Sequence, residues 1–144
     1  MDWPILAADL GLDAYTRMDI ITTDRQPARR PLFWEGSAKR DFKQFPTAVQ
    51  KDMGVALFVV QLGGTPPSAK PWKGLGSGVY ELVEDHRGDT WRAVYTVRIA
   101  DSIHVLHAFQ KKSKSGIRTP RADVALIERR LKRLLERYRE DDRS

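Results

Sequence analysis

The chain has no cysteine, few histidines and no long apolar run. The absence of cysteine among its 144 residues excludes disulfide scaffolds, cysteine nucleophiles and cysteine-ligated zinc. None of its three histidines, His86, His104 and His107, lies four residues from another, so the helical zinc motif is absent. The longest apolar run, VALFVV at 55–60, is far shorter than the about 20 residues that span a bilayer. With no recognisable secretory signal, the sequence predicts a soluble, cytoplasmic domain without a membrane partner.

Positive charge is the main feature of the composition. Lysine and arginine number 25 against 19 acidic residues, which gives a net charge of +6. The first 30 residues hold four arginines and five aspartates, so the basic excess lies in residues 31–144. This excess suits a polyanionic partner, because neutralising phosphates is the main source of non-specific nucleic-acid affinity. The alternative is a surface charge that only maintains solubility, and charge alone slightly favours it.

The chain divides into an extension and one domain. Residues 1–30 have no clear hydrophobic period and are predicted to be an N-terminal extension of unknown role. In residues 31–144, alternation and helical spacing predict discrete elements. We expect strands at 32–35, 79–85, 90–100 and 103–111, helices at 37–45 and 46–62, and a last helix opened by Thr119 and Pro120. The segment 65–78, rich in proline and glycine, is expected to be a loop.

The element order β-α-α-β-β-β-α predicts an α+β fold. It contains a small, antiparallel-rich, four-stranded sheet, an N-terminal helical hairpin and a C-terminal helix, because two short turns join the last three strands. The pattern leaves open whether the first strand lies at the edge or the centre. Alternation predicts that Arg92 and Tyr95 lie on opposite faces of their strand, and likewise His104 and His107.

Basic and aromatic residues are interleaved along the predicted sheet and the segments that flank it. Phosphates bind to cations and unstacked bases stack on flat rings, which is the usual way of holding single-stranded RNA. Burial of the rings under the helices is the alternative; for Trp91 we adopt it, and for Tyr95 the two interpretations are equal. The basic members are Lys70, Lys73, Arg92, Arg98, Lys111, Lys112, Lys114 and Arg118, and the aromatic members include Tyr95 and Phe109.

Arg92 and two residues near these cations are candidates for chemistry. Arg92 is expected either to form a cross-strand pair with Glu81 or Glu84, or to stabilise the charge developing on a scissile phosphate. His107 is either a packed strand residue or a proton carrier, because its ordinary pKa lies near neutrality. Glu81 is a second candidate proton acceptor. A ribonuclease that uses the RNA 2′-hydroxyl as nucleophile needs only a base, an acid and cationic support, so no metal or cofactor is expected.

Four short motifs in order resemble the RelE/ParE toxin superfamily, most closely its phage-derived HigB-like branch. They are KPWKGLG at 70–76, VYEL at 79–82, WRAVY at 91–95 and VLHAFQKK at 105–112, and the resemblance covers about residues 31–139. It implies a RelE-like fold and the toxin of a type II toxin–antitoxin pair. RelE-like members cut mRNA in the ribosomal A site without metal and leave a 2′,3′-cyclic phosphate.

The resemblance also implies roles for individual residues. The arginine typical of the family's strand motif corresponds to Arg92, and the basic position late in the last strand corresponds to Lys111 or Lys112. The loop lysines correspond to Lys70 and Lys73. The tyrosine or histidine that assists catalysis near the C-terminus in many members has no counterpart here, and His107 is our substitute. The predicted catalytic set is therefore Arg92, His107, Lys112 and Glu81, and the predicted RNA-binding set is Lys70, Lys73, Tyr95, Phe109, Lys111 and Lys114.

Partners follow from the same resemblance. It implies a separate antitoxin with a helix-turn-helix domain, and contact with operator DNA only through that antitoxin. The expected substrate is mRNA on the ribosome. Three alternatives stay open: a ParE-like poison of DNA gyrase, a non-catalytic module that binds RNA or the ribosome, and a toxin whose active residues have decayed.

Overall fold

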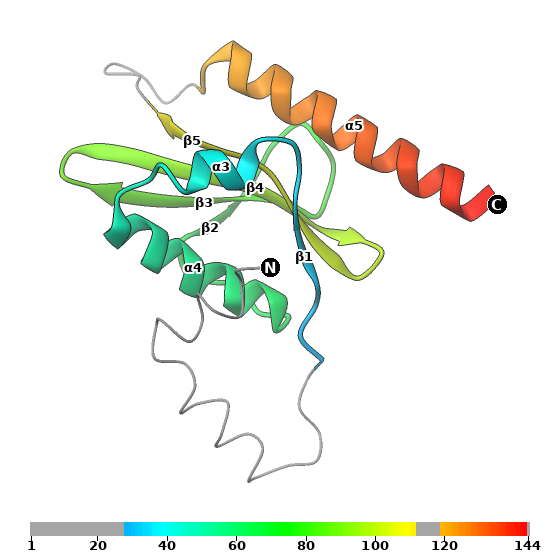
Figure 1. The fold of residues 1–144 in the computed structure, drawn as a ribbon, viewed down its shortest axis with the longest axis horizontal. Helices are drawn as coiled ribbons and strands as arrows, with labels where there is room; N and C mark the ends of the chain where they lie inside the picture. The colour runs from blue at the N-terminus through cyan, green and yellow to red at the C-terminus, as the bar shows by residue number, and fades with distance from the viewer. Residues whose placement is uncertain (1–27, 112–118, 144) are drawn as a thin grey trace, which may run out of the picture.

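The computed structural model describes residues 28–111 and 119–143. Residues 1–27, most of the predicted extension, lie outside the described residues, as does the basic segment 112–118. Five strands and three helices are described (Figure 1). In chain order they are β1 (Leu32–Trp34), α3 (Ala38–Phe42), α4 (Thr47–Gln61), β2 (Ala69–Pro71), β3 (Val79–His86), β4 (Asp89–Ile99), β5 (Ser102–Lys111) and α5 (Arg121–Arg143).

The strands form one mixed sheet in the order β1-β5-β4-β3-β2. β1 lies at one edge and runs parallel to β5, and the other neighbours are antiparallel. The α+β class is therefore confirmed, but the predicted strand number of four is wrong, because the element order contains one more strand after the two helices. The added strand, β2, falls inside the expected loop. It has no apolar alternation, and backbone pairing to β3 holds it at an edge, where a proline is tolerated.

Tight turns join β3, β4 and β5 into the predicted meander. Arg87 and Gly88 both have positive φ, at 51° and 85°, as a two-residue primed turn requires. Ala100 and Asp101, with φ of 52° and 53°, make the second turn, one residue earlier than expected. Neither is a glycine, so this turn has a small conformational cost.

The two faces of the sheet are covered by different helices. In Figure 1 the sheet lies between α4 below and α5 above. The larger hydrophobic cluster lies between the sheet and the helices α3 and α4. Its most buried members include Phe42, Met53 and Leu57. Against α5 packs a smaller one, made of Val79, Val94, Leu106, Phe109, Ile127, Leu131 and Leu134. Among the described helices, none is both long enough and apolar enough to cross a membrane.

A bulge in β5 changes which side chains share a face. His107 pairs with Val94 and Val105 pairs with Tyr95, so Leu106 is left without a partner on β4. An extra residue of this kind reverses the alternation after it. His104 and His107 therefore both point toward α5, and the prediction that they occupy opposite faces is wrong.

Candidate functional site

The α5 face of the sheet carries an ion pair between neighbouring strands. Nη1 of Arg92 on β4 donates to both carboxylate oxygens of Glu81 on β3, at 3.0 and 2.9 Å. Glu81 is opposite Val94, two residues along from Arg92, so the pair is a diagonal cross-strand contact. Of the two carboxylates considered as partners, the structure therefore selects Glu81. The side chains are 13% and 12% exposed, so each charge is mostly desolvated and depends on the other.

Two lysines extend this pair into a basic strip. Lys70 on the edge strand β2 is exposed and directly opposite Glu81, so it belongs to the same face. Lys111 is the last residue of β5, and its ammonium group interacts electrostatically with both Arg92 and Glu81. Desolvation and the positive charge of Arg92 lower the pKa of Lys111, and Glu81 opposes them. We call Lys70, Glu81, Arg92 and Lys111 the basic strip; it holds three cations and one carboxylate.

His107 lies on the same face but is held in place by α5. Its Nε2 is 2.7 Å from Oδ1 of Asp123 in the first turn of that helix, and its ring stacks on Phe109 at 4.8 Å. The residue is 6% exposed, and its Nδ1 is buried without a hydrogen-bond partner. In this arrangement His107 fastens the start of α5 to β5, which is the structural alternative considered for it.

A second polar cluster, around His104, connects the C-terminal half of α5 to β5 and to the residue after β1. Glu35, which follows β1, is 3.1 Å from Nδ1 of His104 and accepts a 2.6 Å hydrogen bond from Arg137. Tyr138 lies 3.4 Å from Nε2 of His104. Burial raises the pKa of Glu35, but the hydrogen bonds and charges of Arg137 and His104 outweigh it, so the pKa lies below its ordinary value. The sequence analysis missed this cluster, because it depends on the parallel register of β1 with β5.

The structure places the predicted site residues in different surroundings. Arg92, Glu81, Lys111 and Lys70 come together in the basic strip, and His107 and Phe109 lie on the same face but are buried. Lys73 is exposed on the loop between β2 and β3. Lys112 and Lys114 lie outside the described residues.

Tyr95 is placed where it cannot join the basic strip. It is 2% exposed on the α4 face, and its ring stacks on Tyr80 with centroids 5.8 Å apart. Its assignment as a stacking residue for RNA beside Arg92 is therefore corrected: alternation along β4 sends the two side chains to opposite faces.

Metal ligands are not grouped in the part of the chain described. Within residues 28–111 and 119–143, no three histidine, aspartate or glutamate side chains come together as a set that could hold an ion.

The comparisons with known proteins give one family. The model of the family described as "Phage derived protein Gp49-like (DUF891)" matches residues 40–132, which include the ion pair, His107, Lys111 and Asp123. No curated protein and no solved structure matches the chain. The family is associated with toxins of type II toxin–antitoxin systems, which implies an antitoxin as partner. Because the match spans more than half of the chain, the protein belongs to the Gp49-like phage-derived family.

Proposed function

We propose that this protein is a RelE-like, HigB-like toxin that cuts mRNA on the translating ribosome without a metal ion. The observation that carries the proposal is the basic strip, in which Arg92, Lys70 and Lys111 surround one carboxylate on one face of the sheet. Membership of a family associated with toxins agrees with it. A strip of cations is what binding and cleaving a polyphosphate chain requires.

The chemistry assigns one task to each member. The 2′-oxygen of the RNA forms a bond to phosphorus while the bond from phosphorus to the 5′-oxygen breaks, leaving a 2′,3′-cyclic phosphate. Glu81 accepts the proton of the 2′-hydroxyl, because Nε2 of His107 faces Asp123 and its Nδ1 is buried. Lys111 supplies a proton to the departing 5′-oxygen. Arg92 donates to the non-bridging phosphate oxygens, where charge increases in the transition state. Lys70, and Lys73 on the adjoining loop, bind neighbouring phosphates.

Contact with a phosphate requires Arg92 to share its donors. In the free protein Nη1 is committed to Glu81, and Nε is buried without a partner. The guanidinium has five N–H donors, so it can keep one carboxylate contact while other donors turn to the substrate. Glu81 thereby holds Arg92 in position in addition to being a candidate base.

The proposal is tested by mapping new 5′ ends on a reporter mRNA in a translating bacterial extract. We expect cuts inside the reading frame that disappear when initiation is blocked. Arg92→Ala should reduce cleavage about 100-fold or more, as loss of one transition-state donor does. Arg40→Ala is the matched control, because Arg40 is exposed on α3, away from the strip.

Loss of folding is separated from loss of chemistry by a second variant. Arg92→Lys keeps a positive charge beside Glu81 but lacks the guanidinium fork, so it should fold and still cleave poorly. Cuts that persist without ribosomes would make the protein a free ribonuclease. No cuts from well-folded protein, or full cleavage by Arg92→Ala, would refute the assignment and leave gyrase poisoning or RNA binding without cleavage.

A further inference from the structure

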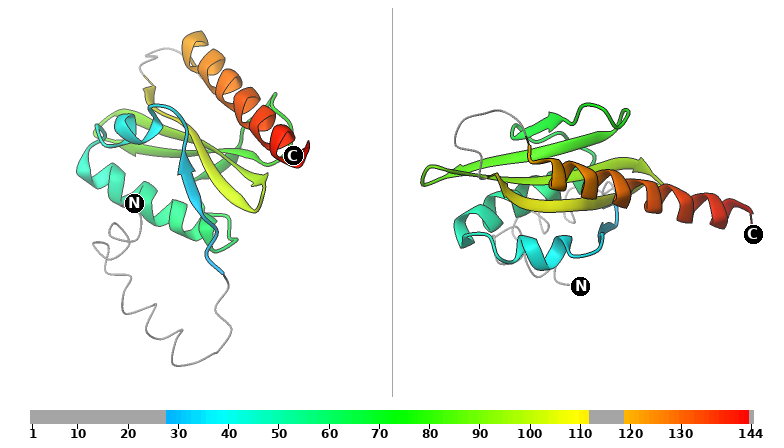
Figure 2. Two further views of the ribbon diagram at one scale, coloured as in Figure 1. Left: turned by 45° about the vertical axis from the view of Figure 1, so that its right-hand side comes forward. Right: turned by 90° about the horizontal axis from the view of Figure 1, so that it is seen from above.

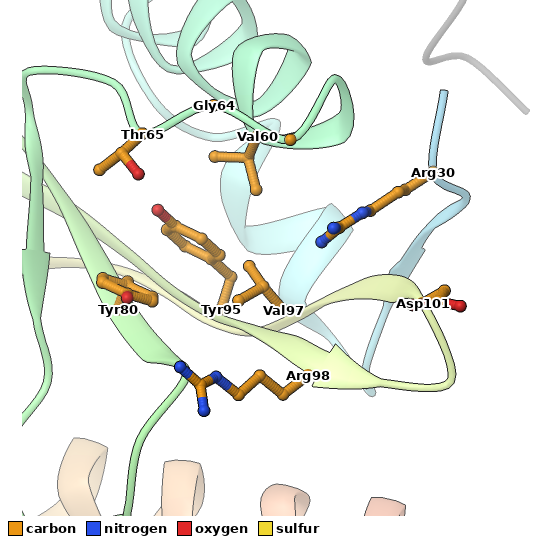
Figure 3. A pocket seen from close by; sticks show the side chains of 10 residues that line it. Arg30, Val60, Gly64, Thr65, Tyr80, Tyr95, Val97, Arg98 and Asp101 are labelled. Atoms are coloured by element: carbon orange, nitrogen blue, oxygen red, sulfur yellow. The ribbon is translucent and has the colours of Figure 1, made fainter. Parts of the chain in front are cut away.

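A cavity opens on the α4 face of the sheet, on the opposite side from the basic strip. It has a volume of about 460 Å³ and lies between the C-terminal end of α4, the segment before β1 and the strands β3 and β4. Arg30, Val60, Thr65, Tyr80, Tyr95 and Val97 are the lining residues that matter for its chemistry (Figure 3). Drug-sized ligands occupy cavities of roughly 300–1,000 Å³, so this one can hold a small molecule.

The main chain places Arg30 firmly at this cavity. Its N–H donates to the carbonyl of Gln61 at 2.9 Å, and its carbonyl accepts from Nε2 of Gln61 at 2.7 Å. Gln61 is the last residue of α4 and is 3% exposed, so these two hydrogen bonds hold the backbone of Arg30 against the end of that helix. Figure 3 shows the guanidinium reaching over the cavity. Among the described residues, no carboxylate forms an ion pair with it.

Tyr95 supplies a second donor. The residue is 2% exposed, yet its hydroxyl points into the cavity and has no hydrogen-bond partner among the described residues. Burial, and then the neighbouring Tyr80, raise the pKa of Tyr95, so the phenol stays protonated and can donate. Because Tyr95 lines the open cavity, a ligand oxygen there can accept from its hydroxyl.

The remaining walls complete a site for an anion attached to a ring. Thr65 adds a hydroxyl, and the partly exposed ring of Tyr80 stacks on Tyr95 and offers a flat surface. Arg98 touches the cavity, but its side chain runs on the other side of β4 and donates to Ser77 at 3.3 Å. Asp101 stands at the rim. The cavity is therefore lined by the hydroxyl donors of Tyr95 and Thr65 and by the cationic guanidinium of Arg30.

We propose that this cavity binds a small organic anion, a flat ring bearing a phosphate or carboxylate group. The anionic oxygens accept from the guanidinium of Arg30, whose planar fork matches either group, and from the hydroxyl of Tyr95. The ring packs between Val60 and Tyr80. The site is separate from the basic strip and does not depend on the proposed cleavage of RNA.

Calorimetric titration of the full-length protein tests the site. The probes are AMP and GMP for the phosphate class, benzoate for the carboxylate class, and adenosine as the ring without an anion. We expect saturable binding of at least one anionic probe and at least tenfold weaker binding of adenosine than of AMP where AMP is the ligand. Arg30→Gln should weaken binding about tenfold or more, because it removes a charged donor. Tyr95→Phe should weaken it about threefold to tenfold while keeping the ring.

The matched control is Arg29→Gln, one residue away. It removes the same charge, but Arg29 lies over Phe58 at 5.9 Å and does not line the cavity. Wild-type affinity in this control, with loss in Arg30→Gln at unchanged thermal stability, supports the assignment. The proposal is overturned if no anionic probe binds, if adenosine binds as well as the tightest anionic probe, or if the two arginine variants lose affinity equally.

Discussion

The two faces of this sheet differ in how they are covered. On the α4 face, Phe42, Met53 and Leu57 are at most 1% exposed and pack on strand residues that are equally buried. On the α5 face a single helix packs along β5, its C-terminal part extends beyond the sheet, and Leu135 is 41% exposed (Figure 2). The same face carries Arg92 on the central strand β4, Glu81 on β3 and Lys70 on the edge strand β2. One face thus carries the larger apolar cluster, and the other carries the smaller cluster together with the ion pair.

The largest expected effect compares equivalent deletions on the two faces. Leu57 and Leu134 are both 0% exposed, so each change to alanine removes the same buried atoms. Leucine-to-alanine changes in cores lower the free energy of unfolding by about 2–5 kcal/mol, and less where the surroundings can collapse. We expect Leu57→Ala in the upper part of that range and Leu134→Ala in the lower part, measured by urea unfolding. Equal losses would show that α5 is packed as rigidly as α4.

The elements that the sequence predicts well are those with a strong period. The stripe of Val49, Met53, Leu57 and Val60 on α4 is buried as expected. The three long strands lie where their alternation predicts them, although the bulge at Leu106 interrupts that alternation within β5. β2 could not be found this way, since its three residues are held by backbone pairing to β3 rather than by an apolar pattern.

The candidate site was only partly predictable, for a different reason. Arg92 and Glu81 lie on two strands joined by a tight turn, so local register brings them together. The contact of His104 with Glu35 spans 69 residues and needs both the parallel β1–β5 pairing and the bulge at Leu106, neither of which leaves a local signal. Tyr95 was grouped with Arg92 by composition, although alternation along β4 already separated them.

The next effect tests whether the charged face depends on its ion pair. Glu81→Gln leaves the mostly buried guanidinium of Arg92 without a carboxylate, and an uncompensated buried polar group costs about 1–3 kcal/mol. We expect a loss of this size in the free energy of unfolding. A double-mutant cycle with Arg92→Gln should give a coupling of at least about 0.5 kcal/mol. Independent, additive losses would mean that the two residues are held in place by their surroundings instead of by each other.

The smallest effect contrasts one carboxylate from each face across pH. The pKa of Glu35, held by Arg137 and His104, is lowered, so its stabilising contribution is present above the ordinary pKa and lost as pH falls through the folded-state pKa. On the α4 face, burial and then Asp52 raise the pKa of Glu84, so its contribution favours the folded state only at low pH and is lost as pH rises. Glu35→Gln should therefore destabilise the protein most at neutral pH and least below about pH 4.

Glu84→Gln should instead stabilise the protein by about 0.5 kcal/mol at neutral pH, the size typical of a partly exposed charge interaction. Unfolding curves at pH 3.5, 5 and 7 separate the two signs, and a destabilising Glu84→Gln at pH 7 would show that its hydrogen bond to Ser68 outweighs the repulsion.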